Sequence, residues 1–238
     1  MAYRTDPRLA PARVGVEAID EGLRSYMLSV FNYMALGLAI TGLVAFVVGT
    51  TPALYVPIFS SPLKWVVMLA PLGFVFFLSA RLHAMSVSSA QLTFWLFAAV
   101  MGLSLASIFL VFTGESIARV FFITAATFGA TALWGYTTKR DLTGMGSFLF
   151  MGLIGIVIAS LVNIFIGSSA LQFAISVIGV VVFTGLTAWD VQRIKSEYAE
   201  YSSAGEMLAK GAIMGALSLY LNFINLFTSL LHLFGNRE

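Results

Sequence analysis

Residues 142–189 read LTGMGSFLFMGLIGIVIASLVNIFIGSSALQFAISVIGVVVFTGLTAW, and no charged side chain interrupts them. A membrane-spanning helix needs about 20 consecutive apolar residues, so this run is long enough for two. Gly167, Ser168 and Ser169 form the natural break in it, which predicts a tight antiparallel hairpin of two helices. The apolar residues do not alternate with polar ones, as strands of a membrane β-barrel would require. This stretch therefore predicts a helical membrane protein.

Long uncharged runs separated by a few charges continue through the whole chain. Hydrophobic residues make up 59% of it and charged residues 10%, against about 25% charged residues in ordinary soluble domains. The mean hydropathy is +0.94, and a soluble fold of this size could not bury that much apolar surface. We therefore expect an all-α integral membrane protein, a bundle of seven transmembrane helices. The expected spans are Met27–Val48, Trp65–Ala80, Ser88–Phe112, Ile117–Tyr136, Gly146–Ile166, Ala170–Asp190 and Leu208–Phe234.

The distribution of Lys and Arg predicts the orientation, because these residues concentrate in cytoplasmic segments. Seven spans put the two termini on opposite sides of the membrane. Ten basic residues fall on the side of the N-terminus: Arg4, Arg8, Arg13, Arg24, Arg81, Lys139, Arg140, Arg193, Lys195 and Lys210. Three fall on the other side: Lys64, Arg119 and Arg237. The prediction is an N-terminus in the cytoplasm and a C-terminus outside.

The predicted organisation is a cytoplasmic N-terminal tail over residues 1–24 and a single seven-helix transmembrane domain over residues 25–238. The longest loop is expected at Val191–Lys210. Since this segment is charged and cytoplasmic in the predicted orientation, it is the expected contact point for a soluble partner.

Side chains for enzyme chemistry are scarce. The chain has no cysteine and two histidines, His83 and His232, so disulfides and thiolate metal sites are excluded. Paired intramembrane aspartates, a Ser–His pair, an H-E-x-x-H motif and a nucleotide-binding loop are all absent from the sequence. The net charge of +2 provides no basic stripe for nucleic acid. We expect no enzyme activity, no cofactor and no nucleic-acid partner; the lipid bilayer is the expected surrounding.

The last predicted span carries a polar stripe. Its members recur at steps of three and four residues, which places them on one helix face: Gly211, Gly215, Ser218, Asn222 and Asn225. The two glycines and the serine are interpreted as a packing seam, where small residues let helix backbones approach. Asn222 is different, because an amide in the middle of a span needs polar partners.

Asp190 and Arg81 are the charged residues expected at the cytoplasmic ends of the sixth and second spans. They could meet there and form a bidentate pair that acts as a latch between helices. Two plainer interpretations stay open. Asp190 could pair with Arg193, three residues further along the same helix, and Arg81 could reach the lipid headgroups as an anchor.

Several segments together resemble the Bax inhibitor 1 family (transmembrane Bax inhibitor motif proteins), in its bacterial branch. The resemblance is carried by ALSLYLNFINLF at Ala216–Phe227, DVQRIK at Asp190–Lys195, FFITAATFG at Phe121–Gly129 and GYTTKRDL at Gly135–Leu142, and it extends over nearly the whole chain. It implies a seven-helix bundle with the last helix near the centre, located in the bacterial inner membrane. It also implies a passive, pH-sensitive calcium leak.

In that family pattern, two aspartates on spans six and seven share a proton and pair with an arginine at the end of span two. By position these roles fall on Asp190, Asn222 and Arg81. Asn222 departs from the pattern because an amide cannot ionise, and proton sharing requires two acids. Calcium prefers six to eight oxygen ligands, so Asp190 is expected to offer at most a weak calcium contact.

Two functions remain open. The first is a calcium leak channel gated by a polar cluster at the cytoplasmic ends of helices two, six and seven, formed by Asp190, Asn222, Arg81 and Asn225, with a pH dependence weakened by Asn222. The alternative is a regulator of a membrane-bound protease in membrane-protein quality control, without transport. A secondary transporter is the weaker third idea, because inverted repeats and matching broken helices are missing from the sequence.

Overall fold

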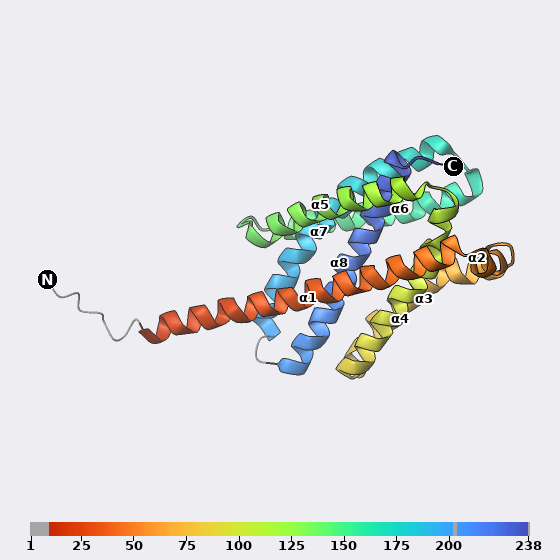
Figure 1. Cartoon of the computed structure of the whole chain (residues 1–238). Helices are drawn as coiled ribbons and strands as arrows, with labels where there is room; N and C mark the ends of the chain where they lie inside the picture. The colour runs from red at the N-terminus through yellow and green to blue at the C-terminus, as the bar shows by residue number, and fades with distance from the viewer. Residues whose placement is uncertain (1–9, 202–203, 238) are drawn as a thin grey trace.

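The computed structural model describes residues 10–201 and 204–237, and over these residues the chain is almost entirely helical (Figure 1). The described part holds eight α-helices: α1 (Ala10–Thr50), α2 (Pro52–Phe59), α3 (Leu63–Arg81), α4 (Val87–Leu105), α5 (Gly114–Thr137), α6 (Thr143–Ile166), α7 (Ser169–Tyr201) and α8 (Gly205–Phe234). Short 3-10 turns, η1 (Leu82–Ala84) and η2 (Ala106–Leu110), follow α3 and α4. Seven of the helices, all except α2, are long and apolar enough to cross a membrane. The predicted seven-span helical fold is confirmed.

The structure differs from the sequence prediction in three places. Helix α2 is an additional short helix between the first two spans, and it begins with Pro52 in its first turn, where a proline costs no hydrogen bond. Helix α1 begins at Ala10, so much of the expected tail over residues 1–24 is helix continuous with the first span. The prediction of a long loop at Val191–Lys210 is wrong, because α7 continues to Tyr201 and α8 already begins at Gly205.

The predicted hairpin between α6 and α7 is present. Gly167 ends α6 in the left-handed conformation with φ 65°, which glycine adopts without a steric penalty. The side chain of Asn163 accepts a hydrogen bond of 2.9 Å from the backbone N–H of Ser168. Helix α7 then starts at Ser169, so the two helices return beside each other as the sequence predicts.

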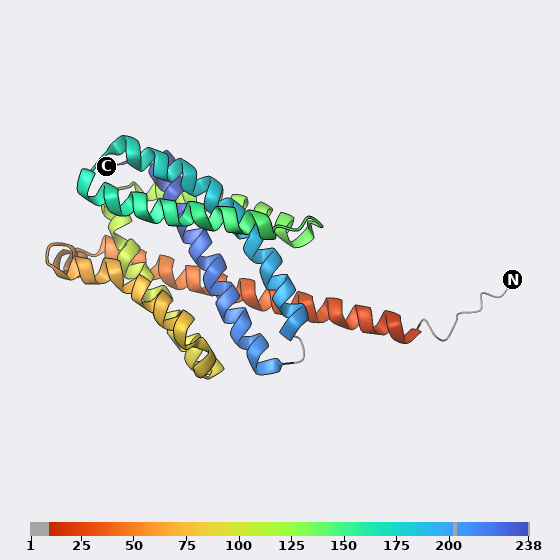
Figure 2. The same cartoon turned by 180° about the vertical axis from the view of Figure 1, so that it is seen from behind.

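Helix α8 forms the centre of the bundle and is surrounded by α1, α4, α5 and α7 (Figures 1 and 2). In the most apolar 18-residue stretch of α8, 67% of the residues are buried, whereas in the corresponding stretch of α6 only 6% are buried. Tyr220, Leu219 and Leu226 have no exposed surface. The family resemblance implied a central last helix, and the structure has one.

Small residues set the close approach between α5, α7 and α8. A Cβ atom on Gly135 of α5 would lie 2.8 Å from the Cα atom of Ala188 in α7. A Cβ atom on Gly215 of α8 would lie 3.1 Å from the side chain of Ile194 in α7. Apolar burial provides little driving force between helices in lipid, so such close backbone packing is what holds them together.

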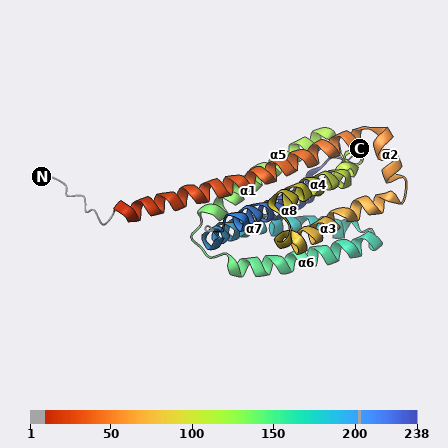
Figure 3. The same ribbon diagram turned by 90° about the horizontal axis from the view of Figure 1, so that it is seen from below.

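Helices α3 and α6 lie at the outside of the bundle, on the same side of α8 (Figure 3). Helix α3 packs mainly on α4, and α6 packs on α7. The space between α3 and α6 leads inward to the polar residues of α7 and α8. Helices α1 and α5 occupy the opposite side (Figure 3).

Candidate functional site

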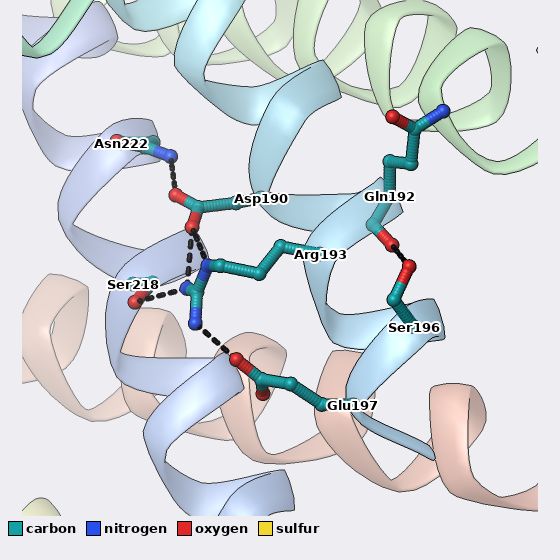
Figure 4. Close-up of polar contacts among 7 residues, drawn as sticks. All are labelled: Asp190, Gln192, Arg193, Ser196, Glu197, Ser218 and Asn222. Carbon is teal, nitrogen blue, oxygen red and sulfur yellow. Dashed lines mark hydrogen bonds and ion pairs between the residues drawn. The ribbon is translucent and has the colours of Figure 1, made fainter. Parts of the chain in front are cut away.

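Asp190 of α7 and Asn222 of α8 face each other inside the bundle (Figure 4). Asp190 is 5% exposed and Asn222 is 6% exposed. The side-chain nitrogen of Asn222 donates a hydrogen bond of 2.7 Å to Oδ2 of Asp190. The structure therefore brings together the two residues that the resemblance places at its proton-sharing positions, and each gives the other the polar partner that burial demands.

Arg193, one turn after Asp190 on α7, neutralises the other carboxylate oxygen. Its Nη2 and Nε atoms lie 2.5 Å and 3.1 Å from Oδ1 of Asp190. Its Nη1 atom donates to Oε1 of Glu197 at 2.6 Å. The guanidinium thus bridges two carboxylates on one face of α7 (Figure 4), and charge-assisted bonds of this kind are the strongest hydrogen bonds in proteins.

Helix α8 and Trp189 complete the surroundings of the guanidinium. Ser218 accepts a hydrogen bond of 3.2 Å from Nη2 of Arg193, and the guanidinium carbon lies 5.3 Å from the ring centroid of Trp189. Ser218 was predicted as a packing residue only, so this polar contact is an addition to that prediction. Gly211 packs against α1 instead. A Cβ atom at this position would lie 3.1 Å from the hydroxyl of Tyr26.

Arg81 does not take part in this network. It is exposed at the end of α3, and within the described ranges no ion pair or hydrogen bond joins it to Asp190. The expected Arg81–Asp190 latch is therefore not formed in this structure. Arg193 occupies that role because it needs only one helical turn to reach the carboxylate, whereas α3 packs away from α7 on α4.

Asn225 lies near the pair but bonds within its own helix. Its side-chain nitrogen donates to the backbone oxygen of Leu221 at 2.8 Å. Asn225 lines the same cavity as Asp190, Arg193 and Asn222. It contributes a polar surface to the cavity wall without contacting the carboxylate.

Two cavities meet the charged bridge from different sides. The larger, about 700 Å³, opens between α3 and α6, and its polar lining includes Asp190 and Asn222. The smaller, about 200 Å³, lies among the ends of α1, α3, α7 and α8, and Glu197 lines it together with Lys210. The Arg193 guanidinium joins the carboxylate that faces the larger cavity to the carboxylate that faces the smaller one.

The loop between α5 and α6 holds α7 in place next to the network. Gln192 donates to the backbone oxygen of Arg140 at 2.8 Å and accepts from the backbone N–H of Leu142 at 2.8 Å. In the same loop, the hydroxyl and N–H of Thr143 donate to Asp141 and lower the pKa of that carboxyl. The residue before Arg193 thus anchors α7 to the loop between α5 and α6.

The charged groups could attract a cation but do not form a preorganised metal site. Asp190, Arg193 and Glu197 together carry one net negative charge. Among the described residues, no group of three or more His, Asp or Glu side chains lies close enough together to hold a metal ion. The oxygens available around Asp190 are those of one carboxylate, amides and a serine hydroxyl, fewer charged ligands than a tight calcium site requires.

Sequence reasoning missed Glu197. It lies in the segment expected to be a loop, and in a loop a spacing of four residues from Arg193 does not predict a contact. On a continuous helix, Asp190, Arg193 and Glu197 follow at steps of three and four residues, which is the spacing that brings side chains together. That spacing was the available signal.

The fold and this buried charge network define a multi-pass helical membrane protein with a polar centre in its bundle. The chain belongs to the Bax inhibitor 1 family: the family model described as "Inhibitor of apoptosis-promoting Bax1" matches residues 23–238. An uncharacterised protein of Rickettsia prowazekii is 49% identical over 222 residues, covering 93% of this chain and 94% of the relative. The inner membrane protein YbhL of Escherichia coli is 46% identical over 219 residues, covering 91% and 94%. This is a multi-pass protein of the bacterial inner membrane.

Proposed function

We propose that the protein is a passive cation leak, with calcium as the expected ion, and that the Asp190–Arg193–Glu197 bridge is its closed gate. The observation that supports this most directly is the position of the Arg193 guanidinium between carboxylates that face two separate cavities. A cation that passes from one cavity to the other must displace it. The gate differs from the one expected from sequence, because Arg193 replaces Arg81.

The charges favour a cation over an anion. Two carboxylates and one guanidinium leave one negative charge in a region of low dielectric constant, where electrostatic attraction is stronger than in water. An approaching cation competes with Arg193 for Asp190. The Arg193 side chain is 30% exposed, so the guanidinium has an adjoining open space into which it can move.

The ligands around Asp190 support passage rather than storage. A permeating ion must bind strongly enough to enter and weakly enough to leave. One carboxylate with the amide oxygen of Asn222 and the hydroxyl of Ser218 provides such a weak site. Since position 222 carries an amide, we propose a leak whose rate changes less with pH than the family pattern implies.

The experiment is calcium flux into proteoliposomes at about pH 6 and about pH 8. The native protein is compared with Arg193→Gln, which removes the bridge, and with Arg119→Gln, which breaks the exposed Arg119–Glu115 pair of 2.7 Å at another place on the surface. We expect flux in the native protein, a several-fold increase in Arg193→Gln and no change in Arg119→Gln. Folded native protein and folded Arg193→Gln that both lack flux would contradict the proposal.

One feature supports the second candidate, a regulator of a membrane-bound protease. Helix α1 extends well beyond the other helices at its N-terminal end (Figure 1), and α7 continues past Asp190 as a charged helix to Tyr201. Both provide surface outside the apolar spans to which a partner could bind. Absence of flux combined with co-purification of a membrane protease that is lost when residues 1–20 are deleted would favour this function.

A further inference from the structure

Helices α1 and α5 border a groove on the outside of the bundle. Both pack inward on α8, and their neighbouring sides enclose a cavity of about 560 Å³. Its walls are apolar and include Met27, Phe31 and Met34 of α1 and Phe128, Gly129 and Ala132 of α5. At one end the lining changes to Arg24 of α1 and Tyr136 of α5. The groove is therefore an apolar slot with a polar mouth.

The slot has the length of one lipid leaflet. Arg24 and Met34 are ten residues apart on a continuous helix, which corresponds to about 15 Å at 1.5 Å per residue. The hydrocarbon core of a bilayer is about 30 Å thick, so the slot extends from the headgroup level to about the midplane. A second apolar cavity of about 500 Å³ continues between the two helices from Leu38 to Phe46 of α1. The first cavity alone has the depth that one acyl chain occupies.

Positive charge gathers at the mouth of the slot. Arg24 is exposed, and the ion pairs found among the described residues do not include it. Lys195 of α7 places its Nζ atom 3.2 Å from the backbone oxygen of Tyr136 and 5.0 Å from the ring centroid of that tyrosine. Lys139 and Arg140 follow directly after α5. With the nearby acids Glu21 and Asp141 counted, these four side chains still leave a net positive charge for a phosphate group.

The opposite end of the α1–α5 groove has a weaker field. Arg119, near the start of α5, is paired with Glu115 at 2.7 Å, which leaves Arg237, stacked at 5.7 Å on the ring of Phe112, as the basic side chain there. The asymmetry means that charge complementarity selects the leaflet on the side of Arg24, which is the cytoplasmic leaflet in the predicted orientation. A zwitterionic lipid has the same phosphate but no net charge, so it would gain less from this arrangement than an anionic lipid.

We propose that the slot between α1 and α5 binds an anionic phospholipid, with an acyl chain along Met27–Met34 and the phosphate at Arg24 and Lys195. The lipid closes the space between α1 and α5, which both also pack on α7 and α8. It is therefore a structural ligand that adds a link between α1 and α5 at the surface of the bundle. This site is separate from the Asp190 network and does not depend on ion flux.

The first test is thermal unfolding of the full chain in detergent with added dioleoyl phosphatidylglycerol or dioleoyl phosphatidylcholine, which share acyl chains and differ in charge. A ligand that binds only the folded state raises the melting temperature. We expect phosphatidylglycerol to raise it clearly more than phosphatidylcholine. Arg24→Gln should weaken the apparent affinity for phosphatidylglycerol about fivefold, the value of one basic residue near a membrane surface. Lys64→Gln, which removes one charge elsewhere, should leave that affinity unchanged.

The second test fills the slot. Gly129 lines the slot and has nothing within 4 Å of the position of a Cβ atom, so the side chain of Gly129→Leu starts in the open space of the slot. Gly155→Leu is the matched control, because Gly155 also has open space around it and lies on the outer helix α6. Native mass spectrometry should show retained phosphatidylglycerol in the native protein and in Gly155→Leu, and several-fold less in Gly129→Leu.

Four outcomes would overturn the proposal. Equal binding of the two lipids would exclude selection by charge, and native-like lipid retention in Gly129→Leu would exclude this slot. An equal thermal shift with inorganic phosphate would indicate a headgroup site without an acyl chain. A dimer that Gly129→Leu dissociates would identify a second copy of the chain as the occupant.

Discussion

The side-chain amide of Asn222 donates a hydrogen bond of 2.7 Å to Oδ2 of Asp190, while Arg193 holds Oδ1 of the same carboxylate at 2.5 Å. One oxygen of the buried acid is thus matched by a charge and the other by an uncharged donor. A carboxylate at position 222 would instead place two acids in contact. The identity of this one side chain therefore determines whether the pair can share a proton.

Asn222→Asp should make the leak sensitive to pH. Two carboxylates at this distance cannot both be ionised without strong repulsion, so the pair retains a proton until the pH rises. We expect calcium flux through the native protein to differ little between about pH 6 and about pH 8, and flux through Asn222→Asp to differ several-fold. Proteoliposome flux at the two pH values measures this.

Asn225→Asp is the matched control for that prediction. Asn225 lines the same cavity, but its side chain bonds to the backbone of Leu221 and not to Asp190. An acid added there changes the cavity charge without creating the pair. If Asn225→Asp gains the same pH response as Asn222→Asp, the response comes from charge in the cavity and the proton-sharing interpretation is wrong.

Glu197→Gln should lower cation flux with little effect on stability. The substitution removes the negative charge of the cluster, since the remaining Asp190 and Arg193 cancel, and so it weakens the attraction for a cation. The Arg193–Glu197 pair is 30% exposed on both sides, and pairs with this access to solvent contribute about 1 kcal/mol or less. Flux in proteoliposomes and melting temperature in detergent are the measurements. Glu200→Gln, an exposed acid on the same helix, should change neither, and equal losses in both variants would assign the effect to general surface charge.

Hydropathy alone was sufficient for the seven spans, because the bilayer imposes length and apolar composition on each helix independently of its neighbours. The contact of Asp190 with Asn222 was also accessible, since both positions carry family motifs and Asn222 lies on the polar face of its helix. The pairing of Arg81 with Asp190 does not form in the structure, which has the alternative pair of Asp190 with Arg193. Two residues at the same membrane surface meet only if their helices pack, and α3 packs on α4. Glu197 was missed because a charged stretch was interpreted as a loop, although charges at steps of three and four residues are equally compatible with a helix that extends beyond the membrane.

Gly135→Ala should destabilise the protein, whereas Gly129→Ala should not. The new methyl group at position 135 would lie 2.8 Å from the Cα atom of Ala188 and closer still to its carbonyl oxygen. A backbone cannot yield as a flexible side chain does, so α5 and α7 must separate; overpacking of this kind costs about 1–3 kcal/mol. Gly129 lies on the same helix with open space around it, so an alanine there gains helix propensity of up to about 1 kcal/mol. Melting temperatures in detergent should move in opposite directions, and equal shifts would contradict the close approach of α5 and α7.

Thr41 and Tyr220 allow a sharper test of the core, because their hydrogen bonds have a direction. Thr41 donates its hydroxyl hydrogen to the backbone oxygen of Ala98 at 2.8 Å, so the contact of 2.6 Å between the hydroxyls of Thr41 and Tyr220 must be donated by the tyrosine. Tyr220→Phe removes a donor and leaves the bond from Thr41 to Ala98 intact. Thr41→Val leaves the tyrosine hydroxyl buried without a partner.

The two substitutions should therefore differ in cost although they remove the same contact. Tyr220→Phe is expected to lower the free energy of unfolding by about 0.6 kcal/mol, the average for side-chain hydrogen bonds in membrane bundles, and Thr41→Val by about 1–3 kcal/mol, the cost of an unsatisfied buried polar group. The double variant removes both polar groups and should cost less than the sum of the single ones. Denaturant unfolding in detergent micelles of the four proteins provides the cycle. Equal losses in the two single variants, or strict additivity in the double variant, would mean that the tyrosine hydroxyl finds another partner and that α1 and α8 are not joined by this bond.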